Sequence, residues 1–520
     1  MSLKLLKSTS VVGIMTLVSR ISGLVRDMVF AQFLGAGLLA DAFFIAFRIP
    51  NFLRRIFGEG AFTVAFVPVF SSVHEHRNPE EVRRFLALMS GRLGLILILL
   101  SLAGIVFAAP IVSILAPGYT DDPVKFAATV DTLRLTFPYL FFISLVAMSA
   151  GILNTCGRFA AAAITPVFLN ISLIAAVLWL MPLLDNAAIA LGSGVLIAGV
   201  VQLLFQLPHL RREGLVPRPA LFAREQEKGD IDTAVGKVFR LMLPAIFGSS
   251  IAQLNVLVNT ILASFLVTGS VSWLYYSDRL MEFPLGVFGV ALATAILPGL
   301  SRSFANDDTD SFNRSLNVAL RWTLLISIPA AAGLAILSVP LLATMFNYRE
   351  FSAHDVLMSA AALRAYAVGL VGFVFVKILA PGFFARQNTA TPVKIGALSM
   401  VVNLFFSLAL FTWLAHVGLA VATSIAAIVN ASLLGYTLKK QGVLKVESGV
   451  KRLGFQVIVA TLAMMVVIWL MAGSDADWLD TQAVYRIGRL ALTVVVGIAV
   501  YIATLGLLGV RPGQLVIKDA

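Results

Sequence analysis

Residues 453–472 read LGFQVIVATLAMMVVIWLMA, a run of twenty residues without a charge. A helix of about 20 residues rises about 30 Å, which is the thickness of the hydrocarbon core of a bilayer. Apolar runs of this kind recur along the whole chain of 520 residues, of which 59% are hydrophobic and 13% charged. Soluble domains average about 25% charged residues. The sequence therefore predicts an all-α polytopic membrane protein and excludes an ordinary soluble enzyme.

The hydropathy, divided at Gly, Pro and charged residues, predicts about fourteen transmembrane helices. The first one follows Lys4 and Lys7, as the core of a signal peptide would, but Arg20 interrupts its apolar run and no A-x-A cleavage site follows. We interpret it as an uncleaved span. The predicted spans lie near 10–34, 38–56, 86–109, 133–156, 161–183, 187–208, 241–266, 272–299, 322–345, 361–384, 393–414, 417–438, 453–472 and 486–508.

The formal net charge of +12 comes from basic residues that lie mostly in the loops of one predicted side. An excess of Lys and Arg marks cytoplasmic loops, so both termini are expected in the cytoplasm. Those loops account for the charge without nucleic acid, and we predict no nucleic-acid partner. Cys156 is the only cysteine, which excludes an intrachain disulfide and argues against a thiol-ligated metal. The opposite loops carry only Lys125, Arg134, Arg349, Arg364, Arg486 and Arg489.

Two pairs of sequence motifs recur at nearly the same offset. Residues 35–71 are echoed by residues 269–301, and residues 151–166 by residues 382–392. This favours duplication, with chance similarity among apolar helices as the alternative, and six spans in each half would make the repeats parallel. The predicted parts are an N-terminal lobe at 1–210, a basic cytoplasmic linker at 211–240, a C-terminal lobe at 241–440, and an appendage of helices 13 and 14 at 441–520.

Charged residues interrupt the first, second, eighth and tenth spans. An arginine at the centre of a membrane helix costs roughly 2.5–3.5 kcal/mol on insertion scales, so such residues normally face a protein interior or a water-filled cavity. The pairs Arg20 with Asp27 and Asp41 with Arg48 both lie seven residues apart, which places each pair on one helical face. For the arginines near the end of the second span, the alternative is that they reach the membrane interface. The full set is Arg20, Arg26, Asp27, Asp41, Arg48, Arg54, Arg55, Asp278, Arg279, Glu282 and Lys377, with Glu59 after the second span.

The acids in these spans suit two roles. They neutralise neighbouring arginines, which is the role we expect for Asp27 and Asp278, or they contact a ligand. Asp278 and Glu282 lie four apart on one face with Arg279 beside them, and Pro284 then interrupts the helix. We therefore expect the eighth span to bend at its charged turn.

No enzymatic motif competes with a transport function. The sequence lacks H-E-x-x-H, G-x-S-x-G and G-x-x-x-x-G-K-[ST], so zinc-hydrolase, serine-nucleophile and NTPase chemistry lack their basic parts. We interpret His74-Glu75-His76 as a solvated run in a polar cytoplasmic loop rather than as a metal site. No enzyme activity, no metal and no cofactor are predicted.

A cationic cavity between two repeated lobes predicts an anionic substrate, because arginine offers paired donors in the geometry of phosphate and carboxylate groups. Several specific motifs accompany these charges. They are S-R at 19–20, R-D at 26–27, D-A-F-F at 41–44, P-N-F-L-R-R-I-F at 50–57, E-G-A-F at 59–62, Y-Y-S-D-R-L-M-E-F-P at 275–284 and K-I-L-A-P-G-F-F-A-R-Q at 377–387. With them the chain resembles, over essentially its whole length, the MurJ (MviN) family of bacterial lipid II flippases, within the multidrug/oligosaccharidyl-lipid/polysaccharide exporter superfamily.

The resemblance implies a fourteen-helix fold that flips lipid II, a polyprenyl pyrophosphate-linked disaccharide peptide, from the inner to the outer leaflet of the bacterial cytoplasmic membrane by alternating access. It also implies a role in cell wall synthesis, contact with membrane lipids, and a groove for the polyprenyl tail along helices 13 and 14. We add Lys377 to the substrate-binding candidates because it lies well inside the tenth span. The substrate-binding candidates are Arg20, Arg26, Arg54, Arg279, Asp41 and Lys377, and their charge partners are Asp27, Glu59, Asp278 and Glu282.

Coupling to an ion and the choice of substrate stay open. A monovalent cation would have to be held by neutral groups, because spans 7 and 9–14 contain no internal carboxylate, and it is left unassigned. The alternative functions are export of drugs or of another lipid-linked oligosaccharide within the same superfamily, and a membrane scaffold. Cationic drugs would favour acids over arginines, and a scaffold gives no reason for central arginines. The neutral candidates for a cation are Asn255, Asn259, Asn403 and Thr423.

Overall fold

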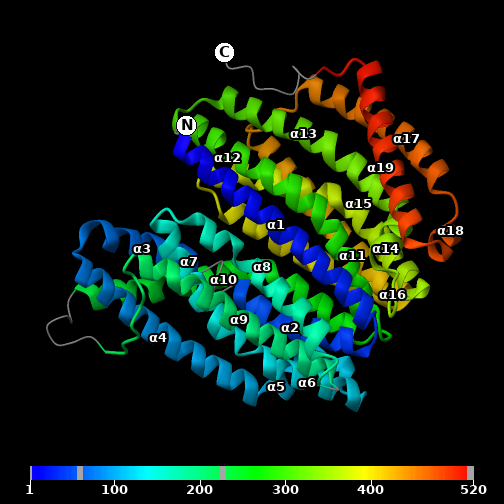
Figure 1. The fold of residues 1–520 in the computed structure, drawn as a ribbon. Helices are drawn as coiled ribbons and strands as arrows, with labels where there is room; N and C mark the ends of the chain where they lie inside the picture. The colour runs from blue at the N-terminus through cyan, green and yellow to red at the C-terminus, as the bar shows by residue number, and fades with distance from the viewer. Residues whose placement is uncertain (1–2, 56–61, 185, 223–229, 512–520) are drawn as a thin grey trace. The chain divides into compact units, whose positions relative to one another are not determined.

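The computed structural model describes residues 3–55, 62–184, 186–222 and 230–511, and in these ranges it consists of helices joined by turns, without a strand (Figure 1). The predicted all-α class is confirmed. Ten helical stretches of the described chain are long and apolar enough to cross a bilayer. The predicted charge partner Glu59 lies outside the described residues. The chain divides into two compact units, Met1–Thr268 and Gly269–Ala520.

The first unit contains α1 to α10. α1 lies along α8, α2 lies against α6, and α7, α8 and α9 contact one another. The turn after α1 uses Gly35 at a φ of 62°, a left-handed conformation that glycine adopts without steric cost. The elements are α1 (Leu3–Leu34), α2 (Leu38–Leu53), α3 (Phe62–His76), α4 (Pro79–Val106), α5 (Ala108–Leu115), the 3₁₀ turn η2 (Pro117–Tyr119), α6 (Pro123–Thr136), α7 (Tyr139–Thr155), α8 (Phe159–Ala175), the π-helical segment η3 (Ala176–Leu180), α9 (Ala187–Arg212) and α10 (Asp230–Ser264).

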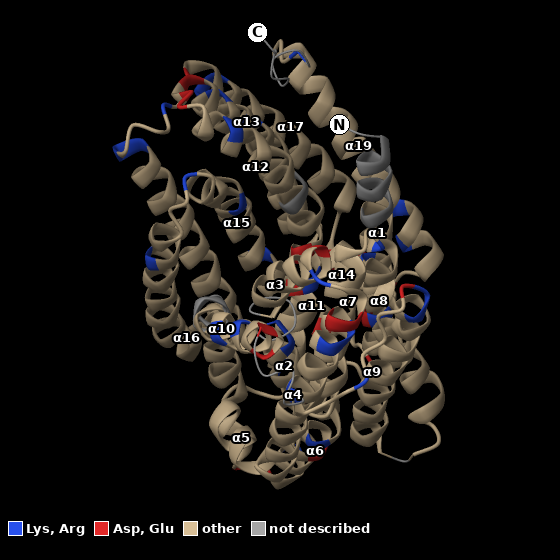
Figure 2. Cartoon of the chain, turned by 90° about the vertical axis from the view of Figure 1, so that its left-hand side faces the viewer, with Lys and Arg blue, Asp and Glu red and all other residues tan. Residues whose placement is uncertain are grey.

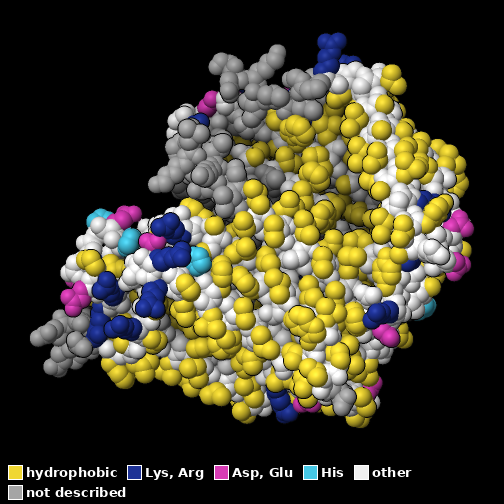
Figure 3. Space-filling view, viewed as in Figure 1, with side chains coloured by type: hydrophobic (Ala, Val, Ile, Leu, Met, Phe, Trp, Pro, Cys, Tyr) yellow, Lys and Arg dark blue, Asp and Glu magenta, His cyan; other side chains and the backbone are white. Residues whose placement is uncertain are grey.

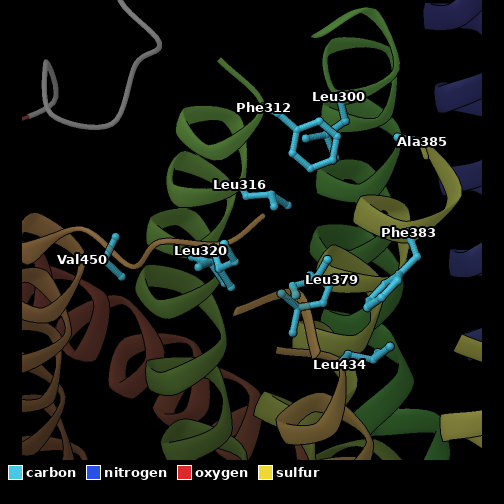
Figure 4. Close-up of a cluster of buried hydrophobic side chains, with 11 residues drawn as sticks. Leu300, Phe312, Leu316, Leu320, Leu379, Phe383, Ala385, Leu434 and Val450 are labelled. Carbon is cyan, nitrogen blue, oxygen red and sulfur yellow. The ribbon is translucent and has the colours of Figure 1, made fainter. Parts of the chain in front are cut away.

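The second unit contains α11 to α19. α15 packs against α11, α13 and α16, and α17 pairs with α19 and also contacts α13. Leucine and phenylalanine side chains from α12, α13, α15 and α16 form a buried hydrophobic core (Figure 4). The elements are α11 (Ser270–Pro284), the π-helical segment η5 (Leu285–Gly289), α12 (Val290–Ala305), α13 (Thr309–Ile336), α14 (Ser338–Phe346), α15 (Ala353–Phe384), α16 (Ala390–Lys440), α17 (Ser448–Ala472), α18 (Asp475–Asp480) and α19 (Ala483–Leu507).

Helices occupy every predicted span, but some helix ends differ from the predicted ones. The span at 133–156 is divided between α6 and α7. The spans at 393–414 and 417–438 run together as the 51-residue α16, which breaks at Ala415 with a φ of 48° and a ψ of −130°. The sequence did not predict the 15-residue helix α3. The number of fourteen membrane helices stays a prediction.

The order of elements from α2 to α4 in the first unit recurs from α11 to α13 in the second. α4 and α13 are both 28 residues long, and the side chains of their N-cap residues, Asn78 and Asp308, accept backbone N–H groups of the first turn. α2 is followed by π-helical residues at 54–55, and α11 is followed by the π-helical η5. A π segment is rare, so its presence after both helices supports the predicted duplication.

A polar clasp joins equivalent positions in each unit. Arg158 Nε donates to Glu213 Oε1 at 2.8 Å, and Arg386 Nη1 donates to Gln441 Oε1 at 2.7 Å, across 55 residues in both cases. Glu213 is the C-cap of α9 and Gln441 is the C-cap of α16. Both partners are displaced by 228 residues (386 against 158 and 441 against 213), so the clasps align residues 158–213 with residues 386–441.

Part of the predicted linker at 211–240 is held against α4. Ala220 N donates to Ala87 O at 2.9 Å, and Arg92 Nε donates to Leu221 O at 3.2 Å. Gly91 makes this approach fit, because a Cβ there would lie 2.2 Å from Ala220 O. Helix α10, which the sequence assigns to the second lobe from residue 241 on, packs against α3 and α4 in the first unit. The predicted lobe boundaries stay a prediction.

The surface suits a lipid environment. Hydrophobic side chains cover most of the face in Figure 3, while Lys and Arg gather near α3 at the edge of the first unit. Large apolar side chains on the two C-terminal helices are exposed, including Leu470 on α17 and Leu507 on α19. Figure 2 shows charged residues mainly at helix ends and turns, with a few part-way along helices.

Candidate substrate-binding site

A buried ion pair lies in α1. Arg26 Nη2 and Nε donate to Asp27 Oδ1 at 2.6 and 3.0 Å, and Arg26 Nη1 donates to Asn170 Oδ1 of α8 at 3.1 Å. The guanidinium also lies over the ring of Phe30, with 5.7 Å from Cζ to the centroid. Both charged side chains are buried. Asp27 thus neutralises the arginine beside it, as expected from the sequence.

Asn170 extends this pair along the contact between α1 and α8. Its Nδ2 donates to Ser19 O at 3.3 Å and to Ser22 Oγ at 2.8 Å. Arg20, which follows Ser19, is half-buried, and its side chain makes no ion pair or hydrogen bond with the residues that the structure describes. Arg26 is therefore bound into the packing of the unit, whereas the guanidinium of Arg20 makes no such contact with the described residues.

Asp41, in the first turn of α2, belongs to a second buried ion pair. Its Oδ2 lies 3.8 Å from Lys125 Nζ of α6. Lys125 Nζ also donates to Thr268 Oγ1 at 3.3 Å and lies 4.2 Å from the centroid of the Tyr119 ring. Asp41 is 1% exposed and Lys125 is 5% exposed. Burial, with a smaller effect of the Asp41 carboxylate, raises the pKa of the Tyr119 hydroxyl, so this phenol stays neutral.

The structure corrects the sequence prediction for Lys125. In the sequence analysis it is counted among the few basic residues of the outer loops. In the structure Asp122 and Pro123 begin α6, with Asp122 as the N-cap, and the lysine side chain points inward to Asp41. A buried lysine needs a counter-charge, which explains the pairing.

Further along α2, two arginines donate hydrogen bonds to uncharged side chains. Arg48 Nη1 donates to Thr260 Oγ1 of α10 at 2.5 Å, and Arg54 Nε donates to Asn51 Oδ1 at 3.0 Å. From Asp41 to Arg54 the helix rises about 20 Å, at about 1.5 Å per residue. That is about two-thirds of a 30 Å hydrocarbon core. The charged residues of α2 therefore lie at two or more levels along the helix and do not form one cluster.

In the second unit, Arg279 projects from α11 beside an acid and an aromatic ring. Its Nη1 lies 3.1 Å from Glu282 Oε2, and its Cζ lies 4.8 Å from the centroid of the Tyr275 ring. A third of the side chain, 32%, is exposed. Asp278 precedes Arg279 in the same turn. After Pro284 the helix changes from α to the π-helical η5, which leads directly into α12, and the predicted bend stays a prediction.

Lys377 lies at an exposed position of α15. Its aliphatic stem passes the π-helical segment that follows α11, because a Cβ on Gly289 would lie 3.8 Å from Lys377 Cγ. The tenth predicted span thus brings its lysine next to the end of the charged eighth span. Within the second unit, Arg279 and Lys377 lie on elements that both contact η5.

The groups considered for a cation are partly brought together. Thr423 Oγ1 donates to Asn403 Oδ1 at 3.3 Å, between the two halves of α16. Asn255 and Asn259 lie in α10 of the first unit. In the part of the chain that the structure describes, no group of three or more His, Cys, Asp or Glu residues is placed to hold a metal.

In the sequence analysis the His74-Glu75-His76 run is placed in a loop. In the structure it lies in the last turn of α3. The His74 ring stacks on Phe70 at 5.6 Å between centroids, and His76 Nδ1 lies 3.0 Å from Ser72 O. The apolar run from Phe62 continues the helix further than the polar residues suggest. The two histidines therefore complete a helix end.

Two arginines counted as outer loop charges also prove to be part of the packing. Arg486 is 5% exposed, and its Cζ lies 5.2 Å from the centroid of the Tyr348 ring. Arg489 Nη2 donates to Ala472 O at 2.9 Å, and its Cζ lies 4.7 Å from the centroid of the Trp478 ring. They fasten the start of α19 to the ends of α14 and α17. In the sequence, this packing role is indicated by the spacing of three residues between the two arginines, which places both on one helical face.

Comparison with known proteins identifies one family. The family model described as "Lipid II flippase MurJ" matches residues 30–487. The chain is 44% identical to the "Probable lipid II flippase MurJ" of Vibrio cholerae serotype O1, over 98% of this chain and 97% of that protein. It is 38% identical to the "Lipid II flippase MurJ" of Burkholderia cenocepacia, over 95% and 96%.

Solved structures give the same picture of the fold. The structure titled "Lipid II flippase MurJ, inward closed conformation" matches with a TM-score of 0.79 at 26% identity, over 95% of this chain and 98% of that one. An inward-facing multidrug resistance MATE family transporter of the MOP superfamily matches with a TM-score of 0.66 at 17% identity, over 84% and 96%. The second likeness shows a shared fold alone.

Proposed function

Because the chain belongs to the lipid II flippase MurJ family, we propose that it moves lipid II from the inner to the outer leaflet of the bacterial cytoplasmic membrane, for cell wall synthesis, by alternating access. The chain is a multi-pass membrane transporter and not an enzyme. The similarity spans nearly the full length of the relatives, so it includes every helix described above.

The proposed headgroup ligands are arginines whose guanidinium groups are part-exposed on membrane helices. The setting of Arg279 carries this assignment, because Glu282 and Tyr275 hold the side chain on α11 while a third of it stays exposed. Arg20 in the first unit is half-buried in a comparable way. A pyrophosphate offers acceptor oxygens in the geometry that a guanidinium recognises. Arg20, Arg54 and Arg279 are the proposed contacts to the phosphates.

The other candidate residues receive supporting roles. Arg26 and Asp41 are buried in ion pairs, and we propose that they position α1 and α2. Lys377 adds a cation beside η5. Removing one partner of a buried ion pair is strongly destabilising. Loss of either Arg26 or Asp41 should therefore act through the structure as well as through transport.

The lipid tail and the orientation complete the proposal. The exposed apolar side chains of α17 and α19 support a lateral surface for the polyprenyl tail. The basic loops of one predicted side support a cytoplasmic position for both termini. Coupling to a monovalent cation stays unassigned, with Asn403 and Thr423 as the neutral pair that lies in hydrogen-bonding distance.

Transport is tested with purified protein in liposomes that carry labelled lipid II, by the accessibility of the label in each leaflet. We expect Arg279→Ala to slow movement about tenfold or more, because a hydrogen bond to a charged group contributes roughly 1.5–3 kcal/mol. Arg134→Ala is the matched control, because Arg134 forms an exposed pair with Asp131. Unchanged accessibility with wild-type protein, under both an imposed potential and a sodium gradient, would refute the function. Preferential movement of a cationic drug or of another lipid-linked oligosaccharide would favour the alternative.

A further inference from the structure

The first unit contains a cavity of about 510 Å³, of which the transport proposal uses only Arg54. Helices α7, α8 and α9 form most of its wall, and Arg54 at the end of α2 also lines it. The wall is largely small and apolar, with Ala150 and Ala163 among its residues. Ligand pockets in proteins have volumes of roughly 300–1,000 Å³ and mostly apolar walls with a few placed polar groups. This cavity has both properties.

The placed polar groups form a row on one side of the cavity. Tyr139 Oη donates to Gln202 Oε1 at 3.3 Å, and Gln202 Nε2 donates to Thr165 O at 3.0 Å. Gln206 Nε2 donates to Thr165 Oγ1 at 2.9 Å. Gln206 is fully buried, yet its Oε1 accepts no hydrogen bond from the described residues. An acceptor buried without a donor is unfavourable, so this oxygen marks a place for a donor from outside the protein.

The second unit shows that the fold does not need this glutamine. The aligned clasps place Gln206 and Leu434 at equivalent positions, each seven residues before the C-cap of its helix. Leu434 is buried in the hydrophobic core with Leu379 and Phe383, which Figure 4 shows beside it. The same fold position therefore accommodates a buried apolar side chain. The fold therefore does not require an amide at this position.

The chemistry of the lining identifies the class of ligand. Gln206 Oε1 needs one N–H or O–H donor, the alanines leave room for a small apolar group, and Arg54 attracts an anion. A secondary amide with a methyl-sized substituent, linked to a phosphate, provides all three. We infer that this cavity seats an amide group of the transported headgroup, next to phosphates held by Arg54. The inference rests on the proposed lipid II transport and assigns Gln206 as a specificity-determining residue.

Binding by the purified full-length chain in nanodiscs tests this site with three lipids. These are the full precursor, the same lipid without its peptide, and the bare polyprenyl pyrophosphate. We expect Gln206→Leu to weaken binding of the full precursor about tenfold, the effect of one lost hydrogen bond with its donor left unpaired. Binding of the bare pyrophosphate should stay unchanged. If the peptide-free lipid is also weakened, the amide is on the sugar, and if it is not, the amide is in the peptide.

Two further variants make the test decisive. Ala150→Leu keeps Gln206 but fills part of the cavity, and it should produce the same selective weakening. Gln456→Leu is the control, since Gln456 is another buried glutamine, which donates to Leu508 O at 2.8 Å in the second unit. Equal affinity of wild type, Gln206→Leu and Ala150→Leu for the full precursor overturns the inference, as does equal weakening for all three lipids. If either of these outcomes is found while the wild-type protein moves lipid II, only the assignment of the cavity is refuted. If the wild-type protein does not move lipid II, the proposed function itself is refuted.

Discussion

Replacing Lys125 with methionine tests the buried ion pair that holds α2 to α6. The substitution keeps the length of the side chain and removes its charge. Asp41 then remains in a site where it is 1% exposed, without the ammonium 3.8 Å away. Breaking a buried pair in this way destabilises a protein by about 3–5 kcal/mol. For a unit of this size we expect the midpoint of unfolding to fall by about 6–10 °C, at roughly 2 °C per kcal/mol.

The assay is thermal unfolding of the purified protein in detergent, with two comparison variants. Arg134→Met removes an exposed pair with Asp131 on the same helix α6, where the side chains are 48% and 51% exposed. Exposed pairs contribute about 0–1 kcal/mol, so this control should move the midpoint by about 2 °C or less. The double variant Lys125→Met with Asp41→Asn removes both charges of this pair and should recover most of the loss. A Lys125→Met midpoint equal to that of Arg134→Met, or a double variant no more stable than Lys125→Met, would refute the reasoning.

Two other predictions concern packing within a single unit. Arg26→Ala and Asp27→Asn should each reduce the free energy of unfolding by about 3–5 kcal/mol. The double variant should lose clearly less than the sum of the two single losses, because both residues take part in one interaction. Additive losses in the same unfolding assay would contradict the ion pair. Gly372→Val should destabilise the contact of α15 with α16 by about 1–3 kcal/mol or more, because a Cβ there already lies 2.8 Å from the Ala427 backbone. Gly396→Ala, where nothing lies within 4 Å of the added Cβ, should instead stabilise α16 by roughly 0.5–1 kcal/mol; equal shifts of the two glycine variants would speak against the packing.

The membrane helices were predictable because their cause is local. In lipid every backbone N–H and C=O must be satisfied within the segment, so a long apolar run can only be a helix. This holds for residues 453–472 whatever they pack against. The neighbouring residues Arg26 and Asp27 are predictable partners for the same reason. The interruption at Pro284 also follows from one residue, because proline removes a helix hydrogen bond.

Contacts between distant segments were not predictable in this way. Asp41 and Lys125 meet only because α2 lies against α6, and the lysine carries the usual signs of a loop charge. Uncharged polar residues are still harder to interpret, since Asn170, Gln202 and Gln206 hardly lower the hydropathy of their spans. Their importance depends on which helix face they occupy and on which groups meet them there. The cavity lined by Gln206 therefore becomes visible only when the helices are assembled.

The two clasps that align the repeats differ in one chemical respect. Arg158 meets the carboxylate of Glu213, whereas Arg386 meets the neutral amide of Gln441. The attraction between two exposed charges is screened by dissolved salt, while a bond from one charge to an amide depends on salt much less. Raising the ionic strength should therefore weaken the Arg158–Glu213 interaction of the first unit and leave the Arg386–Gln441 interaction of the second unit largely unchanged. The clasp of the second unit is thus an internal control for the clasp of the first, because added salt acts mainly on the Arg158–Glu213 pair.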